Sequence, residues 1–185
     1  MNEHLARRVL AGALDDRAIK AALGAWMPQP PRRVDRLGLQ ALLGAAPFKG
    51  QVQPDAGLYL AARYPARSNM YALLDAVCRQ SRLPKPFEFV NSVSNAAGFQ
   101  VAQWLGIDGP NLFIGAGDDA WSRLLELAEA DLAFGQAGQA LLLHCDEDEA
   151  GFRIEALLLA PGRPLPRGTT FAQLTATLTV DEQRL

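Results

Sequence analysis

The stretch that most constrains the fold is residues 111–135, NLFIGAGDDAWSRLLELAEADLAFG. It opens with a short apolar run bounded by glycine- and proline-containing turns, which is typical of a buried strand. From Trp121 to Leu132, apolar residues then recur at the spacing of one helix face. We therefore predict a strand, a tight turn of small residues and a helix that ends at Gly135. In α/β folds such a turn is where nucleophiles and ligands are found.

Two acids, Asp118 and Asp119, stand where the predicted helix begins. Carboxylates at this position accept hydrogen bonds from free backbone N–H groups and suit the helix dipole. We therefore interpret Asp118 chiefly as a helix cap, worth about 1 kcal/mol. A nucleophile or general base here is disfavoured, because no histidine or lysine is evidently placed to assist.

The rest of the chain alternates strand and helix signals, which predicts a mainly parallel, five-stranded α/β sheet covered by helices. A six-residue turn joins the last two confident strands, so these form an antiparallel hairpin, expected at the sheet edge. Residues 5–14 fit either a strand or a helix, and residues 83–95 are expected to be extended because of their prolines. We predict helices at 15–26, 34–46, 70–80 and 96–105, and strands at 57–64, 139–145, 152–159 and 174–180.

Composition excludes several classes of function. The formal net charge of −2, with acids and bases mixed along the chain, argues against nucleic acid as a partner. No apolar run approaches the roughly 20 residues of a membrane span, and no signal peptide is evident, so we expect a cytoplasmic protein. Cys78 and Cys145 are far apart and the chain has two histidines, so we expect neither a metal site nor any other cofactor.

Three blocks in order resemble the N-terminal half of the β-ketoacyl synthases, which have the thiolase fold. They are RVDRLGLQALLGAA with GLYLAARY, then LPKPFEFVNSVSNAAGFQVAQWLGIDGPN, then the strand, turn and helix with FGQAGQALLLHCDE. SVSNAAG and LLLHCDE are particularly similar to short chain-length-factor-like proteins of aryl-polyene and related pathways. The resemblance implies half of a thiolase-like fold over residues 32–163, after a variable N-terminal region at 1–31 with a helix and a proline-rich connection, and before a C-terminal tail at 164–185.

The resemblance also implies that the chain is not an enzyme. Counted back from the glycine that ends the helix, the family's acyl-accepting cysteine falls on Asp118, and a carboxylate cannot form the thioester. Cys78 and Cys145 lie on other predicted elements, and the family's two catalytic histidines lie in a C-terminal half that this sequence does not contain. We therefore expect a catalytically inactive subunit.

Chain-length-factor-like subunits pair with an active synthase, and in that family the strand before the nucleophile turn pairs across the dimer axis. Here that strand is residues 111–117, so the resemblance implies a heterodimer interface, with the polar run 91–95 nearby. The expected interface residues are Asn111, Leu112, Phe113, Ile114, Gly115, Asn91, Ser92, Ser94 and Asn95.

The resemblance leaves several roles open. Asp118, Asp119, Trp121 and His144 are candidates to line an acyl pocket, although packing in a core or interface is the commoner role for Trp121 and His144. An acyl carrier protein is a possible further partner. The subunit would support or set acyl or polyene chain elongation. One alternative is a stand-alone homodimeric module that binds an acyl carrier protein or an acyl ligand; another is a small hydrolase or transferase that uses Asp118, Asp119 and His144.

Overall fold

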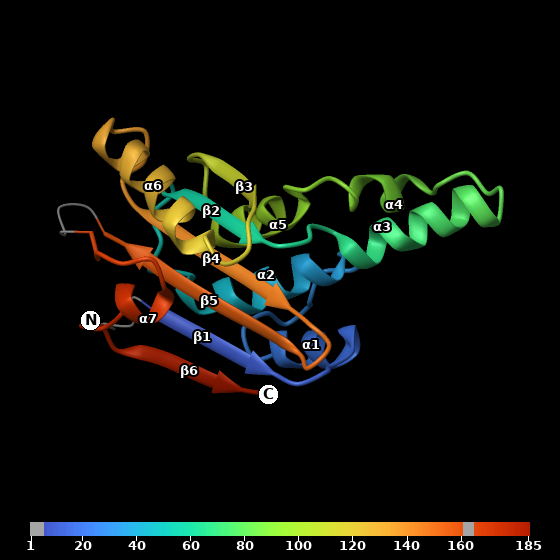
Figure 1. Ribbon diagram of the computed structural model, residues 1–185, viewed down its shortest axis with the longest axis horizontal. Coiled ribbons are helices and arrows are strands. Elements are labelled where there is room, and N and C mark those ends of the chain that lie inside the picture. The colour runs from blue at the N-terminus through green and yellow to red at the C-terminus, as the bar shows by residue number, and fades with distance from the viewer. Residues whose placement is uncertain (1–5, 161–164) are drawn as a thin grey trace.

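The computed structural model describes residues 6–160 and 165–185. Its centre is a six-stranded sheet in the order β3-β2-β4-β5-β1-β6, with helices on both faces (Figure 1). The strands are β1 (Ala6–Ala11), β2 (Gly57–Ala62), β3 (Asn111–Gly115), β4 (Ala140–Glu147), β5 (Phe152–Leu159) and β6 (Val180–Arg184). The helices are α1 (Asp16–Leu23), α2 (Arg36–Ala45), α3 (Arg67–Leu74), α4 (Pro86–Val90), α5 (Ala96–Leu105), α6 (Ala120–Ala133) and α7 (Phe171–Leu174), with the short helices η1 (Ala46–Phe48) and η2 (Asp75–Arg79).

The sheet confirms the predicted α/β class and corrects two of its details. β2 runs parallel to β3 and β4, and β4 and β5 form the predicted antiparallel hairpin. The sheet has six strands rather than five, and the hairpin lies inside it rather than at its edge, because β1 and β6 continue the sheet beyond β5. The undecided segment near the N-terminus is thus strand β1. The expected boundary at residues 163–164 lies outside the described residues.

Alternation along the strands divides the interior into two apolar layers. In β4, Leu141 and Leu143 face α1, α2 and α5, whereas Leu142 faces α6 and α7. All six residues of β2 are buried, as expected for a strand covered on both faces. The result is a three-layer arrangement in which the turn before α6 lies at the carboxyl end of β3.

Two predicted segments differ from the structure. Residues 86–90 form helix α4 rather than an extended segment, because Pro86 occupies the first helical turn, where its missing N–H costs nothing. The strand expected at 174–180 is instead helix α7 followed by β6. Thr170 accepts a hydrogen bond from the Gln173 backbone N–H, and the Gln173 side chain reaches back to Thr170, a capping box that starts the helix.

Candidate functional site

The turn between β3 and α6 presents Asp118 to solvent. Its side chain is 99% exposed, and Oδ1 accepts a hydrogen bond from Nη2 of Arg63 at 2.7 Å. Asp119 is the residue before the helix, but it makes no side-chain cap bond and pairs instead with Arg123 one turn later. The predicted cap is therefore wrong for this helix, because an arginine takes each carboxylate.

Arg63 was not anticipated as part of this site. It follows the end of β2, and its guanidinium lies so close to Gly117 that a Cβ there would be 2.9 Å from its Cζ. The hydrogen bond with Asp118 raises the pKa of the Arg63 guanidinium. Asp118 is thus held in an ion pair across the turn, which does not resemble an activated base. In the sequence, Arg63 lies inside the predicted strand 57–64, so no local pattern marked it as a neighbour of the turn.

Neither cysteine lies at the turn. Cys78 is exposed in η2, and Cys145 is buried in β4. Burial raises the pKa of the Cys145 thiol well above its ordinary value, which disfavours the nucleophilic thiolate. The thiol of Cys145 is therefore suited to packing rather than to nucleophilic attack.

Three of the four candidate pocket residues line one cavity of about 250 Å³: Asp118, Trp121 and His144. Asp119 is not part of the lining. Across the hairpin, His144 pairs in register with Glu155, whose Oε2 accepts a hydrogen bond from Trp121 Nε1 at 2.8 Å. Glu155 was missed by the sequence analysis, although a single acid inside the apolar strand FRIEALLL was a visible signal for a buried polar contact.

Strand β3, the expected interface strand, lies at one edge of the sheet with β2 as its only neighbour among the described residues. Leu112 is 41% exposed on this edge. Phe113 and Ile114 are half-buried, and the Asn111 side chain lies against Gly98 of α5. An uncovered edge strand is a template for pairing with another chain.

The polar run 91–95 joins α4 to α5. The Asn91 side chain donates a hydrogen bond to the carbonyl of Arg33, and the Ser92 hydroxyl donates to the carbonyl of Phe89. Ser94 and Asn95 are exposed. Asn95 directly precedes α5, and its side chain makes no cap hydrogen bond to that helix. The first two side chains serve the local turn, whereas the last two face solvent.

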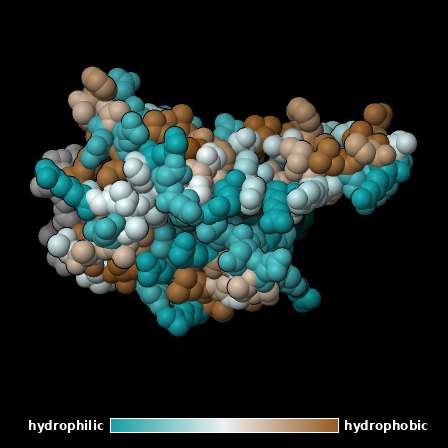
Figure 2. Space-filling model, viewed as in Figure 1, coloured by the Kyte–Doolittle hydropathy of each residue, from teal (hydrophilic) through white to brown (hydrophobic). Residues whose placement is uncertain are grey.

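Residues 67–90, which we call the arm, project from the body of the molecule (Figure 1). They contain α3, η2 and α4, and none of the residues of α3 or α4 is buried. Hydrophobic residues gather along the arm in Figure 2. Leu83 is 87% exposed and Phe89 is 65% exposed, and Met70, Tyr71, Leu74, Val77, Phe87 and Val90 are also exposed. This exposure could not be predicted, because apolar residues recur at the same helical spacing on a face that packs in the core and on a face that stays uncovered.

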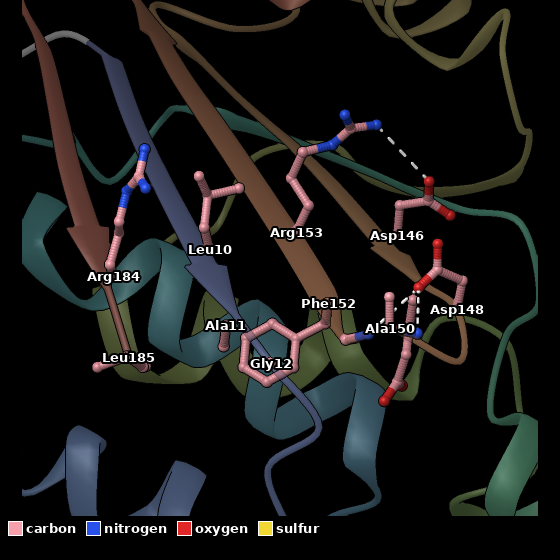
Figure 3. Close-up of a pocket in the computed structure, with 12 residues that line it drawn as sticks. Leu10, Ala11, Gly12, Asp146, Asp148, Ala150, Phe152, Arg153, Arg184 and Leu185 are labelled. Carbon is pink, nitrogen blue, oxygen red and sulfur yellow. Dashed lines mark hydrogen bonds and ion pairs between the residues drawn. The ribbon is translucent and has the colours of Figure 1, made fainter.

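A second hollow lies at the hairpin tip, between the ends of β1, β5 and β6 (Figure 3). Its volume is about 460 Å³. Arg153 lies 3.6 Å from Asp146, and Asp148 accepts backbone hydrogen bonds from Ala150 and Gly151. These carboxylates are used by the turn itself, as expected for a hairpin tip.

Two general features concern residues 6–160 and 165–185. No helix there combines the length and apolar character that crossing a bilayer requires. That part of the chain also contains no group of three or more histidine, cysteine or acidic side chains arranged to hold a metal ion.

Comparison with known proteins identifies the fold. No family model and no curated protein matches the sequence. Among solved structures, the ishigamide ketosynthase/chain length factor superimposes with a TM-score of 0.65 at 17% identity, covering 76% of this chain and 48% of that one. The ketosynthase ApeO in complex with its chain length factor ApeC, from Xenorhabdus doucetiae, gives 0.65 at 18% identity, covering 85% and 77%.

A third similar structure is the AntDE:AntF complex of a type II polyketide synthase ketosynthase with its acyl carrier protein, at a TM-score of 0.53 and 15% identity, covering 72% of this chain and 45% of that one. The chain thus spans about half the length of the first and third matches. These likenesses define the class: an α/β domain with the half-thiolase fold of ketosynthases and chain length factors, as the sequence motifs predict.

Proposed function

We propose that this chain is a non-condensing, ketosynthase-like subunit that pairs with an active β-ketoacyl synthase and helps set the length of its acyl or polyene product. The observations that carry the proposal are the exposed apolar residues of the arm and the free edge of β3. The similar structures support it, since two of them contain a ketosynthase and a chain length factor.

The apolar surface of the arm extends toward the β3 edge. Helix α5 follows the arm and packs beside β3. Phe99 of α5 is 59% exposed and Leu112 of β3 is 41% exposed, so both elements also present an apolar side chain to solvent. Monomeric proteins rarely expose apolar patches beyond a few hundred Å² unless the patch is a binding site. A protein partner that adds contacts along β3 and covers the arm fits this surface.

The chemistry of the turn supports the proposed absence of condensing activity. Condensation in the ketosynthase family needs a thiolate that accepts the acyl group, and Asp118 offers only a carboxylate paired with Arg63. The buried Cys145 and the distant, exposed Cys78 do not replace it. The contribution of this chain would then be structural: it would complete the partner's interface and shape the space available to the growing product.

Light-scattering mass after size exclusion tests the pairing, with the chain expressed alone and together with an active ketosynthase from the same organism. We expect a one-to-one complex of the chain with the synthase. Phe89→Asp on the arm and Leu112→Asp on the edge should each weaken the complex by at least about tenfold, since each places a charge in an apolar contact.

Phe134→Asp is the matched control, because Phe134 is 78% exposed at the end of α6, away from the arm (Figure 1). It should leave the complex intact. A stable monomer that ignores the synthase would overturn the proposal, as would condensation of malonyl and acyl thioesters by the chain alone. A homodimer that ignores the synthase would instead support the stand-alone binding module.

A further inference from the structure

The cavity beside Asp118 is lined by charged side chains from several elements. It lies between the first turns of α6 and α7, over β4, β5 and β1. Across the strands, Arg8 of β1 stands opposite Glu155 of β5, which stands opposite His144 of β4. This polar row crosses a sheet face that otherwise packs apolar residues against α6. A polar row in such a place needs either internal partners or a ligand.

The charges in this cavity are paired with one another. Glu155, only 6% exposed, accepts hydrogen bonds from Trp121 and from Arg8, whose Nε lies 3.2 Å and Nη2 3.1 Å from Oε1. Arg153 lies 3.6 Å from Asp146, and Asp118 is held by Arg63. A charged ligand would therefore have to displace an existing ion pair. The lining favours a neutral guest.

His144 is the group left without a partner. It is 5% exposed, and its buried Nε2 has no hydrogen-bond partner among the described residues. Its Nδ1 lies 4.0 Å from Glu155 Oε2, beyond hydrogen-bond distance. Burial lowers the pKa of the imidazole, so the ring is neutral at neutral pH and one of its nitrogens is a donor and the other an acceptor.

We infer that this cavity binds a small neutral molecule with an amide or hydroxyl group, which hydrogen-bonds to His144 and packs its apolar part against Trp121 or Phe171. An amide or hydroxyl both donates and accepts, so it satisfies either tautomer of the ring. Trp121 and Phe171 have ring centroids 5.1 Å apart and supply the aromatic surface. The volume of about 250 Å³ limits the guest to a molecule of modest size.

Three probes of the same shape test the charge preference: neutral benzamide, anionic benzoate and cationic benzamidine. Titration calorimetry should show saturable binding of benzamide, and the other two should bind at least about tenfold more weakly, because each must break an ion pair. The calorimetry can use either the chain alone or its complex with a synthase.

Histidine-selective ¹⁵N labelling locates the binding. The chain contains two histidines, His4 and His144, so two sets of ring signals are expected and His4 is an internal reference. Benzamide should move the ring nitrogens of His144 and leave those of His4 in place. His144→Phe should weaken benzamide binding by at least about tenfold, whereas His144→Gln, which keeps a hydrogen-bonding group, should retain most of it.

Equal binding of the three probes, no saturable shift of the His144 nitrogens, or unchanged benzamide affinity in His144→Phe would each overturn the inference. The comparison of probes on the unmodified chain does not depend on whether either variant folds. It can also be made without a ketosynthase, so a negative result would leave the proposed pairing untouched.

Discussion

The sheet and the arm are both rich in apolar residues, yet these residues are buried very differently. Every residue of β2 is inaccessible, and Leu141, Leu142 and Leu143 of β4 are completely buried between two helical layers. In the arm, α3 and α4 contain no buried residue. Hydrophobic stabilisation scales with the apolar area removed from water. The sheet therefore buries most of its apolar residues within the chain, whereas the arm leaves much of its apolar surface exposed to solvent.

The contacts that hold the arm are mainly polar and local. Arg82 pairs with Glu88, and the hydrogen bond between them lowers the pKa of the Glu88 carboxyl. The Asn69 side chain donates to the carbonyl of Glu88, and the Arg33 guanidinium lies over the ring of Phe87. Exposed ion pairs of this kind are screened by solvent and contribute little. They fix the shape of the arm and leave its apolar side chains free to contact a partner.

The largest expected difference between the two regions is in core truncation. Leu143→Ala removes a completely buried side chain from β4 and should lower the free energy of unfolding by about 2 to 5 kcal/mol. Phe89→Ala on the arm should change it by no more than about 0.5 kcal/mol, although it removes more atoms. Urea denaturation followed by circular dichroism measures both.

The same pair of variants can break the comparison. If Phe89→Ala cost as much as Leu143→Ala, the arm would pack on the body of the lone chain in solution, and its apolar residues would not be available to a partner. If the two variants lost equal amounts of unfolding free energy only in a complex with a ketosynthase, contact with that partner would be what buries Phe89.

A smaller effect should come from His144, the buried imidazole of the sheet. Burial lowers its pKa in the folded state, so below about pH 6.5 the unfolded chain binds more protons than the folded one. As far as it depends on His144, the free energy of unfolding should therefore be at its maximum above about pH 7. It should fall as the pH drops below about 6.5, by at most about 1.4 kcal/mol per pH unit. Unfolding curves between pH 7.5 and 5.5 measure the slope.

His144→Gln provides the reference, because it cannot gain this proton. Above pH 7 the free energies of unfolding of the two proteins should differ by a constant amount, and this difference should change with pH only below about pH 7. An identical slope in both would show that the imidazole of His144 is reached by water in solution, contrary to its burial between β4 and Trp121.

The sheet was largely predictable because strand periodicity reports burial on both faces. The segments 152–159 and 96–105 match β5 and α5, and the edge position of β3 follows from the family resemblance. Strand β1 was ambiguous because its two arginines interrupt the apolar pattern, and both turn out to be paired inside the fold: Arg7 with Asp181 of β6 and Arg8 with Glu155 of β5. Such partners lie more than 140 residues away, and local pattern carries no information about them.

The site was less predictable than the fold for the same reason. The acids at 118 and 119 have the sequence signature of a helix cap. In the structure their carboxylates form ion pairs with Arg63 and Arg123 instead of capping the helix. Exposure of the arm was likewise hidden, since the sequence shows where apolar residues recur but not whether another layer covers them.

The smallest expected effect on stability comes from removing a helix-capping carboxylate, and it distinguishes Asp35, which caps a helix, from Asp118, which does not. Asp35 precedes α2, which packs on the sheet, and its Oδ1 accepts a hydrogen bond from the Gly38 backbone N–H at 3.0 Å. Asp35→Ala should cost about 1 kcal/mol, measured by urea denaturation at pH 7. Asp118→Ala should leave the midpoint unchanged within error, because its exposed carboxylate caps nothing.

A loss in Asp118→Ala equal to that in Asp35→Ala would mean that Asp118 leaves Arg63 and caps α6 in solution, as the sequence pattern alone predicts. The turn would then be stabilised in the same way as the sheet-packed helices, and its ion pair would no longer distinguish it. An unchanged midpoint would instead leave Asp118 free of any role in folding, so that a loss of ketosynthase pairing or product length in the same variant could be assigned to the turn itself.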